Sequence, residues 1–515
     1  MTKLSDYFLS KDNEVECYDY ITEILNCVIE FKNRKKVGNY RDSSDLLEKY
    51  VQKLPEEGVS KEELKFIIKN LLEDSVNFSS KMFMGFPDSG NSIAGLVGGI
   101  LEATCQQNLL NSDFCARAAT FVEISTIKWL RELIGYSNSK ELRSVRELGG
   151  VATTGGTCSN MYGLLMARKR AYPDSFSKGL PINAKPKIFI PGDLTHYSIT
   201  GAAGLLGIGT NSIQKLKTKN FSLDLIDLEN QLKNSLQYGE EIIAVILNAG
   251  DSRTLTIDKI KDACNIIKSI TPSCWIHIDG CHGGQLLFSH KYRDRISGIE
   301  LSDSISLDPH KVFNLPYTLS YFIFRDPMEI DGFWTSSSLI MRDSWALGQM
   351  TPNIGSKSWA SLKLYLMLKH IGKNDLGAII DNRIEMAVKF RNIIKSNPNF
   401  RLLSNSSDIN SVPFVYVGET KNSSKEFAYE LNKKIYEAML IEGEFYIHGF
   451  PLKDECNVLN FGEDNMVFAL RYMCGNPLTE ERDLVDLVDE LSKIGQRIQF
   501  NLEREREKYE PISTS

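Results

Sequence analysis

The chain has 515 residues, of which 42% are hydrophobic and 24% are charged, and its formal net charge is −6. These proportions are typical of a globular protein, and the length is enough for two or three structural regions. The slight acidity gives no electrostatic reason to expect nucleic acid or an anionic membrane as a partner. No apolar run approaches the roughly 20 residues of a membrane span, and the polar N-terminus is unlike a signal peptide.

Three regions follow one another along the chain. Residues 1–84 carry apolar side chains at helical spacing, so a helical N-terminal segment is expected there. In residues 85–350, β-like runs such as 242–247 alternate with helical stretches, a pattern typical of a mainly parallel sheet covered by helices. Residues 351–515 begin with a long helical pattern and continue as a small α+β domain. The sequence therefore predicts an α/β protein with additional regions at both ends.

The ten cysteines are scattered from Cys17 to Cys474 without paired spacing. Such spacing suits reduced thiols in the cytoplasm and neither a disulfide framework nor a zinc site. His277, Asp279 and Cys281 alternate along one strand face and are compatible with a metal site, but a compact second ligand pair such as Cys-x-x-Cys is missing. We therefore expect a cytoplasmic protein without a bound metal.

Three sequence features together indicate pyridoxal phosphate as cofactor. Lys311 follows Asp-Pro-His, Asp279 ends the apolar run that begins at Trp275, and the turn 154–157 precedes a helical pattern. A desolvated lysine has a lowered pKa and forms imines readily, and a carboxylate keeps a pyridine nitrogen protonated. A glycine-rich turn before a helix offers free N–H groups to a phosphate. Each feature alone is compatible with an ordinary turn or cap, but their order along the chain favours the cofactor site.

The order of these motifs resembles the group II pyridoxal-phosphate decarboxylases, the family of glutamate, aromatic amino acid and cysteine sulfinate decarboxylases. The similarity runs from about Phe83 to Arg471, and its motifs are Thr154-Gly155-Gly156-Thr157-Cys158-Ser159-Asn160, Thr195-His196-Tyr197-Ser198, His277-Ile278-Asp279-Gly280-Cys281-His282-Gly283-Gly284 and Asp303-Ser304-Ile305-Ser306-Leu307-Asp308-Pro309-His310-Lys311. The resemblance implies the fold of the PLP-dependent transferases of aspartate aminotransferase type I. It also implies a homodimer in which the N-terminal segment packs across the partner.

The resemblance assigns roles to individual residues. Lys311 would be the Schiff-base lysine, Asp279 the partner of the pyridine nitrogen, and His196 an imidazole stacked on the ring and a candidate proton donor. The other cofactor contacts that it implies are Gly156 and Thr157 at the phosphate turn, His310 and Ser306 beside the phosphate, Ser252 near the cofactor, and Cys281 beneath the ring.

Substrate contacts are less defined. By resemblance, Arg471 meets the substrate carboxylate, and the segment 83–91 lines the substrate pocket. Phe86 would favour an apolar or aromatic side chain, whereas Asp88 would pair with a basic one, and Pro87-Asp88-Ser89-Gly90 is also a good turn sequence in its own right. His282 fits either the mouth of the site or a histidine bonded to backbone.

Two departures from the family pattern bear on the reaction. Family members carry a catalytic tyrosine on a loop after the lysine strand, yet the interval from Phe322 to Leu364 contains no tyrosine, and the expected loop reads Asp331-Gly332-Phe333-Trp334-Thr335-Ser336. In the family, loss of that hydroxyl accompanies oxidative, aldehyde-forming chemistry. The second departure is the segment 251–256, where the family has a threonine pair followed by glycine and alanine. Its charged pair, Asp251 and Arg253, would change the local field beside the cofactor, or Arg253 points into a loop, which explains it best.

The sequence thus predicts decarboxylation of an L-amino acid to its amine and carbon dioxide. The alternatives are an aldehyde-forming decarboxylase-oxidase, a carbon–carbon lyase acting on phosphorylated amino alcohols, and a non-catalytic dimer with the same fold. The lyase would need extra basic residues for the substrate phosphate, which the sequence does not offer. The retained Lys311, Asp279 and His196 argue against the non-catalytic alternative.

Overall fold

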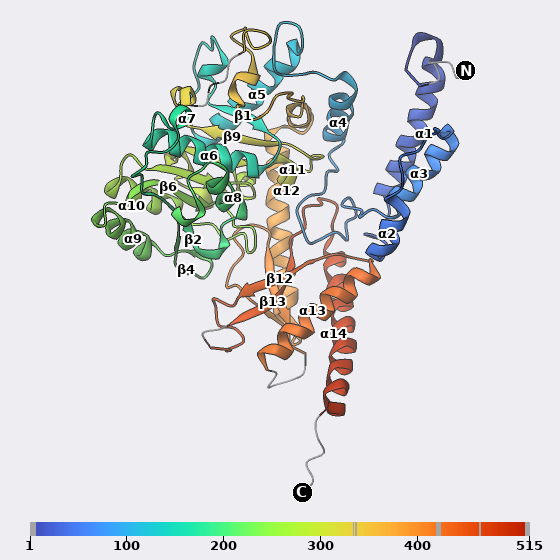
Figure 1. Ribbon diagram of the computed structural model, residues 1–515. Helices are drawn as coiled ribbons and strands as arrows, with labels where there is room; N and C mark the ends of the chain where they lie inside the picture. The colour runs from blue at the N-terminus through green and yellow to red at the C-terminus, as the bar shows by residue number, and fades with distance from the viewer. Residues whose placement is uncertain (1–6, 333, 335–336, 419–423, 463–464, 510–515) are drawn as a thin grey trace.

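The computed structural model describes residues 7–332, 334, 337–418, 424–462 and 465–509. In Figure 1 a large α/β body lies at the upper left, the N-terminal helices lie at the right, and a C-terminal region that ends in a long helix lies below. Within the described residues, the helices are too short or too polar to cross a membrane. The region boundaries near residues 84 and 350 stay predictions.

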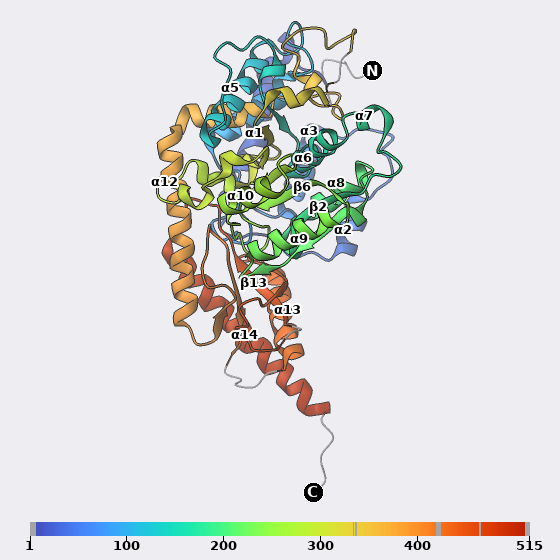
Figure 2. The same ribbon diagram turned by 90° about the vertical axis from the view of Figure 1, so that its left-hand side faces the viewer.

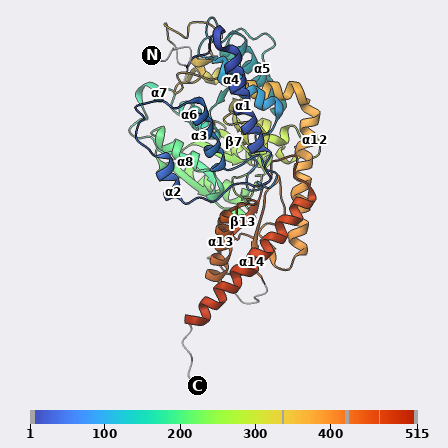
Figure 3. The same cartoon turned by 90° about the vertical axis from the view of Figure 1, so that its right-hand side faces the viewer.

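The N-terminal helices lie beside the body and bury none of their own side chains. They are α1 (Glu14–Lys32), α2 (Ser43–Tyr50) and α3 (Lys61–Glu73). Helix α1 packs against α3, and Figures 1 and 3 show that both lie on the outer side of the molecule, away from the large sheet. Apolar residues at helical spacing produce these helices, as the sequence predicts, but the chain itself leaves their apolar faces uncovered.

A mainly parallel sheet of seven strands forms the centre of the body, in the order β1-β9-β8-β7-β6-β2-β3. Only the pairings of β9 with β8 and β1 are antiparallel. The strands are β1 (Gly150–Thr153), β2 (Pro186–Pro191), β3 (Ile213–Leu216), β6 (Glu241–Asn248), β7 (Trp275–Asp279), β8 (Ser304–Leu307) and β9 (Ser320–Phe324). Strand β7 is buried along its whole length, as expected of a strand covered on both faces.

Helix α6 packs across β6, β7, β8 and β9 and also contacts α8. The helices of the body are α4 (Ile93–Cys105), α5 (Arg117–Ile134), α6 (Gly156–Ala171), α7 (Ser175–Lys178), α8 (Tyr197–Leu205), α9 (Leu225–Gln237), α10 (Ile260–Ile270) and α11 (Pro309–Val312), and a small hairpin joins β4 (Thr218–Lys219) to β5 (Ser222–Leu223). The α/β fold predicted from the sequence is confirmed.

The long helix α12 (Ser361–Ser396) connects the body to the C-terminal region (Figure 2). It packs on α4 and α5, then on β10 and α14. The C-terminal region has a four-stranded antiparallel sheet in the order β10-β11-β13-β12. Its elements are β10 (Phe400–Leu402), β11 (Val412–Tyr416), α13 (Lys425–Glu442), β12 (His448–Lys453), β13 (Met466–Tyr472) and α14 (Glu481–Tyr509).

The sheet brings polar residues together where its central strands end. Asn248 at the end of β6 is in register with Asp279 at the end of β7, which is in register with Ser306 of β8. Ligands of parallel α/β sheets bind at this edge, outside the carboxyl ends of the strands. The short helix α11, which carries Lys311, begins directly after β8.

Candidate active site

A cavity of about 280 Å³ opens at this edge of the sheet. Most of the cofactor residues predicted from the sequence line it, namely Gly156, Thr157, His196, Ser252, Asp279, Cys281, His310 and Lys311. Asn160, His282, Asp308, Tyr317 and Thr318 also line it. The cavity therefore gathers residues that lie far apart in the sequence.

Lys311 forms an ion pair inside the cavity. Its Nζ lies 2.9 Å from Oδ2 of Asp308, one helical turn earlier. Burial by itself lowers the pKa of Lys311, but the charge of Asp308 and the weaker contributions of Cys281 and Asp279 outweigh it, so the pKa is raised. The lowered pKa predicted from desolvation is therefore wrong, because the sequence argument left out the carboxylate at position 308.

Asp279 stays ionised although it is buried. Burial alone would raise the pKa of its carboxyl, but the nearby His196 and Lys311 and the hydrogen bonds from Cys281 and Asn160 lower that pKa to about 2. Oδ2 accepts from Asn160 Nδ2 at 2.9 Å, and Oδ1 accepts from the Cys281 N–H at 3.2 Å. The carboxylate is thus a fixed negative charge at the end of β7.

His196 lies at the N-cap of α8, at the cavity wall. Its Nδ1 is 2.8 Å from Ser198 Oγ and accepts the Ser198 N–H at 3.3 Å. Burial lowers the pKa of the imidazole, with Asp279 opposing. Because Nδ1 is an acceptor, the neutral ring carries its proton on Nε2.

Gly156 starts α6 at a point with no room for a side chain. A Cβ built on it would lie 2.5 Å from Cys281 Sγ and 2.8 Å from Asp308 Oδ2. The first N–H groups of an α-helix have no partner within the helix, so Gly156 and Thr157 present donors at the cavity wall. This arrangement suits a phosphate group.

Three residues predicted to contact the cofactor, Ser306, Cys281 and His310, have polar partners within the protein. Ser306 is completely buried and donates from Oγ to Asp279 at 3.4 Å, while Cys281 Sγ lies 3.4 Å from the same Oγ. His310 Nδ1 lies 2.7 Å from the Leu319 carbonyl oxygen, which accepts a hydrogen bond from the ring N–H at this position. Of the three, Ser306 is set back from the cavity surface and acts on Asp279.

The predicted substrate residues lie outside the cavity lining. Arg471 is buried, with its guanidinium 5.2 Å from the ring centroid of Phe86, and it donates to the carbonyl oxygens of Ser252 at 2.7 Å and Gly85 at 3.0 Å. Asp88 is hydrogen-bonded to Tyr317, and burial raises the pKa of its carboxyl. The three substrate contacts stay predictions.

The loop expected to carry a tyrosine lies partly outside the described residues, since Phe333, Thr335 and Ser336 are not among them. Tyr197 and Tyr317 both line the cavity, and Tyr317 is the one closer in the chain to the interval 322–364. Its ring centroid lies 5.1 Å from that of His310. Tyr317 thus lies before residue 322, outside the interval in which the resemblance places a tyrosine.

Other residues at the site had a sequence signal without an assigned role. Asn160 belongs to the first motif, and Asp308 stands three residues before Lys311, a spacing at which helical side chains meet. His277 Nδ1 lies 2.8 Å from Ser304 Oγ, and its Nε2 lies 3.0 Å from Asn160 Oδ1. Among the described residues, no group of three or more His, Cys, Asp and Glu side chains is arranged to hold a metal ion.

The donor set of the cavity fits pyridoxal phosphate. Lys311 supplies an amine, Asp279 a carboxylate that stays charged when buried, and the start of α6 supplies N–H groups beside a glycine that must lack a Cβ. One cavity thus offers an amine for the aldehyde of the cofactor, a carboxylate for its ring nitrogen and N–H groups for its phosphate.

Comparisons with known proteins agree with this fit. The pyridoxal-dependent decarboxylase conserved domain matches residues 44–417. Mouse CSAD in its apo form is 22% identical with a TM-score of 0.84, covering 93% of this chain and 99% of that chain. Oryza sativa TDC with PLP and tryptamine is 18% identical with a TM-score of 0.83, covering 96% and 100%. Rhodiola rosea 4-hydroxyphenylacetaldehyde synthase is 20% identical with a TM-score of 0.79, covering 95% and 99%.

The domain match spans more than half of the 515 residues and includes every cofactor residue predicted from the sequence. The solved structures share the fold along nearly their whole length. The chain therefore belongs to the family of pyridoxal-dependent decarboxylases, and it is a carboxy-lyase that depends on pyridoxal phosphate.

Proposed function

We propose that this enzyme removes the α-carboxylate of an L-amino acid to give the amine and carbon dioxide, and that Lys311 is the residue to which the cofactor attaches. The observation that carries the proposal is the meeting of Lys311, Asp279 and His196 at one cavity. When bound, pyridoxal phosphate withdraws electrons from the substrate α-carbon, most effectively while its ring nitrogen is protonated.

Each of the three residues has a distinct task in this proposal. The Lys311 ammonium must lose a proton to solvent before its amine can attack an aldehyde, and the ion pair with Asp308 Oδ2, 2.9 Å from Nζ, holds the side chain at the cavity. Asp279 holds a proton on the ring nitrogen by charge attraction. His196 directs its Nε2 proton into the cavity, where it can bind a carboxylate or protonate carbon.

A spectrum of the purified protein tests the attachment site. Wild-type protein with pyridoxal phosphate should show a visible band that borohydride bleaches, and Lys311→Ala should lack both the band and the activity. The exposed Lys291→Ala serves as a control and should behave as wild type. Normal turnover by Lys311→Ala would disprove this part of the proposal.

Substitution of Asp279 tests whether its negative charge keeps the ring nitrogen of the cofactor protonated. Asp279→Asn keeps the size of the side chain and removes its charge, so we expect most of the activity to be lost, at least a hundredfold in kcat, with the fold retained. Circular dichroism and the unfolding midpoint check the fold. A variant with more than half of the wild-type kcat would contradict the assigned role.

The aldehyde-forming reaction is the second candidate. It is favoured by the absence of a tyrosine between Phe322 and Leu364 and by the structural likeness to a 4-hydroxyphenylacetaldehyde synthase. The two reactions differ in their demand for oxygen. Amine formation without oxygen uptake supports simple decarboxylation, whereas peroxide and aldehyde in equal amounts support the oxidative reaction.

The proposal includes a homodimer in the cytoplasm. Helices α1 and α3 bury none of their side chains and expose apolar ones, including Tyr18, Ile21, Ile29, Leu64, Phe66, Ile67 and Leu71. Uncovered apolar faces of this size favour a protein partner. A second copy of this chain is the partner that the predicted crossing of N-terminal segments requires. Free thiols at all ten cysteines support a reducing compartment.

A further inference from the structure

Two residues beside the cavity take no part in the proposed reaction, although both touch its machinery. Asn160 of α6 and His277 of β7 are completely buried. The amide nitrogen of Asn160 donates to Asp279 Oδ2 and to Ser198 Oγ, both at 2.9 Å. One side chain thus connects the carboxylate at the end of β7 with the serine that holds His196.

The direction of the hydrogen bonds behind Asn160 is fixed by the Asp279 carboxylate, which can only accept and therefore faces the amide nitrogen of Asn160, leaving Oδ1 toward His277. The Trp275 indole N–H donates to Ser304 Oγ at 2.7 Å. Because Asn160 Oδ1 can only accept, the neutral His277 ring carries its proton on Nε2, and the Ser304 hydroxyl donates to Nδ1 at 2.8 Å. Nε2 donates to Asn160 Oδ1 at 3.0 Å, so the amide group of Asn160 must direct both its N–H bonds toward the cavity side.

The same direction continues to His196. Because Ser198 Oγ accepts from Asn160, its own proton is available to His196 Nδ1 at 2.8 Å. His196 Nδ1 therefore accepts from both the hydroxyl and the backbone N–H of Ser198. The chain of donors that starts at Trp275 ends in one tautomer of His196, with the proton on Nε2.

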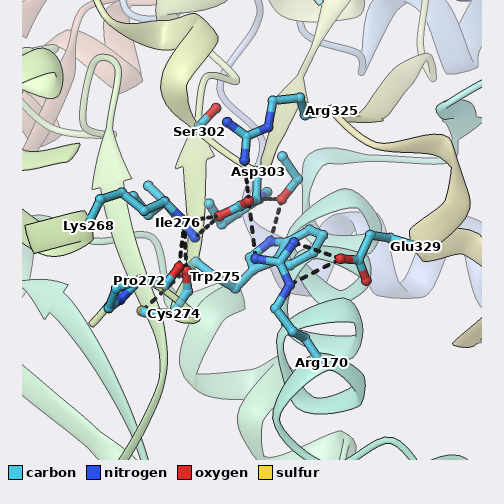
Figure 4. Close-up of polar contacts among 12 residues, drawn as sticks. Arg170, Lys268, Pro272, Cys274, Trp275, Ile276, Ser302, Asp303, Arg325 and Glu329 are labelled. Carbon is cyan, nitrogen blue, oxygen red and sulfur yellow. Dashed lines mark hydrogen bonds and ion pairs between the residues drawn. The ribbon is translucent and has the colours of Figure 1, made fainter. Parts of the chain in front are cut away.

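The chain of hydrogen bonds is anchored at the opposite end of β7. Figure 4 shows Arg170 lying over the Trp275 ring, with its guanidinium 4.2 Å from the ring centroid. Arg170 is bound in turn by Asp303 at 3.1 Å and Glu329 at 2.9 Å. Asp303 also accepts the Ile276 N–H at 2.8 Å, which ties the start of the strand to the same cluster.

The imidazole of His277 packs directly against α6. A Cβ on Gly163 would lie 2.6 Å from His277 Nδ1 and 2.8 Å from Cε1, so the imidazole rests directly on the helix backbone. Burial lowers the pKa of His277 to about 4, which keeps the ring neutral. A neutral ring has one donor and one acceptor, as this chain of hydrogen bonds requires.

We propose that Asn160 and His277 are positioning residues: through one hydrogen-bond chain they hold His196 in its Nε2–H tautomer and hold Asp279 in place as an anion. The hydrogen-bond chain exists in the protein itself, and only the tasks of His196 and Asp279 rest on the proposed function. Positioning groups behind functional histidines commonly fix the tautomer in this way.

The tautomers can be measured directly, because the chain has only seven histidines. Full-length protein labelled with ¹⁵N in histidine is studied by long-range ¹H–¹⁵N correlation at pH 7.5, before and after addition of pyridoxal phosphate. His196→Gln and His277→Gln assign the two signals. We expect both rings to be neutral with the proton on Nε2. A proton on Nδ1 of His277 in the wild type would overturn the proposal.

Asn160→Ala tests whether the hydrogen bonds of Asn160 couple His277 to His196. We expect the His196 signal to change to a mixture of tautomers and kcat to fall 10- to 100-fold with KM within threefold. The matched control is Ser159→Ala on the same helix, which removes a buried hydroxyl bonded to Thr153 at 2.7 Å, outside the hydrogen-bond chain. An Asn160→Ala protein with the wild-type His196 tautomer would refute the coupling.

A pair of substitutions at His277 separates positioning from packing. His277→Gln retains an N–H that can reach Asn160, whereas His277→Leu does not. We expect the Gln variant to keep the His196 tautomer and the Leu variant to lose it, at similar unfolding midpoints. Equal tautomer mixtures in both would contradict the proposal. If Lys311→Ala kept the visible band and the activity, the proposed function would be disproved, whereas these tautomer results would be unaffected.

Discussion

At Gly156 the absence of a side chain decides whether the cavity keeps its shape. A Cβ there would press on Cys281 and on Asp308, which holds Lys311. We expect Gly156→Ala to raise the Kd for pyridoxal phosphate at least tenfold, or about 1.4 kcal/mol. Absorbance titration measures it. Gly201→Ala in α8 is the matched control, because Gly201 lies outside the cavity lining and a Cβ on it has no atom within 4 Å, so the Kd should stay within twofold of wild type. Equal effects of the two variants would contradict the steric argument.

The neutrality of His277 makes the fold sensitive to acid. Its pKa is about 4 in the folded protein and about 6.5 when unfolded, so the unfolded chain binds more protons between these values. Stability is therefore lost as pH falls through this window, by about 2 kcal/mol between pH 7 and pH 5 for this residue. In urea unfolding, the loss of unfolding free energy between pH 7 and pH 5 should be about 2 kcal/mol smaller in His277→Gln than in the wild type. The exposed His370→Gln should retain the wild-type pH dependence.

At the residue scale, the sequence motifs predicted which side chains line the cavity and left out how they are coupled. Asn160, Ser198 and His277 belong to three separate motifs and meet only because α6 packs both on β7 and on α8. A single sequence contains no information on that proximity. The Asp308–Lys311 pair is different, since its spacing was visible in the sequence and would have corrected the predicted pKa.

Among the elements, the buried strands were the easiest to predict. The continuous apolar run 242–247 became β6, and the run ending at Asp279 became β7. A run that is apolar on both faces has few alternatives in an α/β protein. Helix α12 was predicted as a long helical pattern, but periodicity did not indicate the non-helical backbone at Gly372, which has a φ of 77°. Helix periodicity continues across such an interruption, so only the backbone reveals it.

The interruption of α12 gives a test at this scale. A Cβ on Gly372 has no atom within 4 Å, so a substitution there acts through the backbone angle alone. We expect Gly372→Ala to lower the free energy of unfolding by about 1 kcal/mol, because L-residues disfavour positive φ. Gly355→Ala, with equally open space and an ordinary φ, should change it by less than about 0.5 kcal/mol. Urea denaturation of both variants measures the difference.

On the scale of the whole molecule, the large sheet and the C-terminal region have cores of their own, whereas the N-terminal helices do not. The amphipathic pattern predicted these helices correctly, and the same pattern requires something to cover them. The helices lie away from the large sheet (Figures 1 and 3), and the described remainder of the chain leaves apolar side chains such as Ile21, Ile29 and Phe66 exposed. A second copy would bury them.

The proposed dimer should therefore be weakened by substitutions in α1 that leave the cavity untouched. Ile21 and Ile29 are each 54% exposed, and burying such a side chain contributes about 1.5–3 kcal/mol. We expect Ile21→Glu with Ile29→Glu to raise the dimer Kd at least a hundredfold, because two charges would have to be buried. Sedimentation velocity over a concentration series should show wild type at twice the chain mass of 58.2 kDa and the variant near one chain mass. Asn26→Glu adds the same charge beside the apolar face and should leave the dimer intact. A wild-type protein that sediments as a single chain, or a variant that remains a dimer, would show that these helices are covered in some other way.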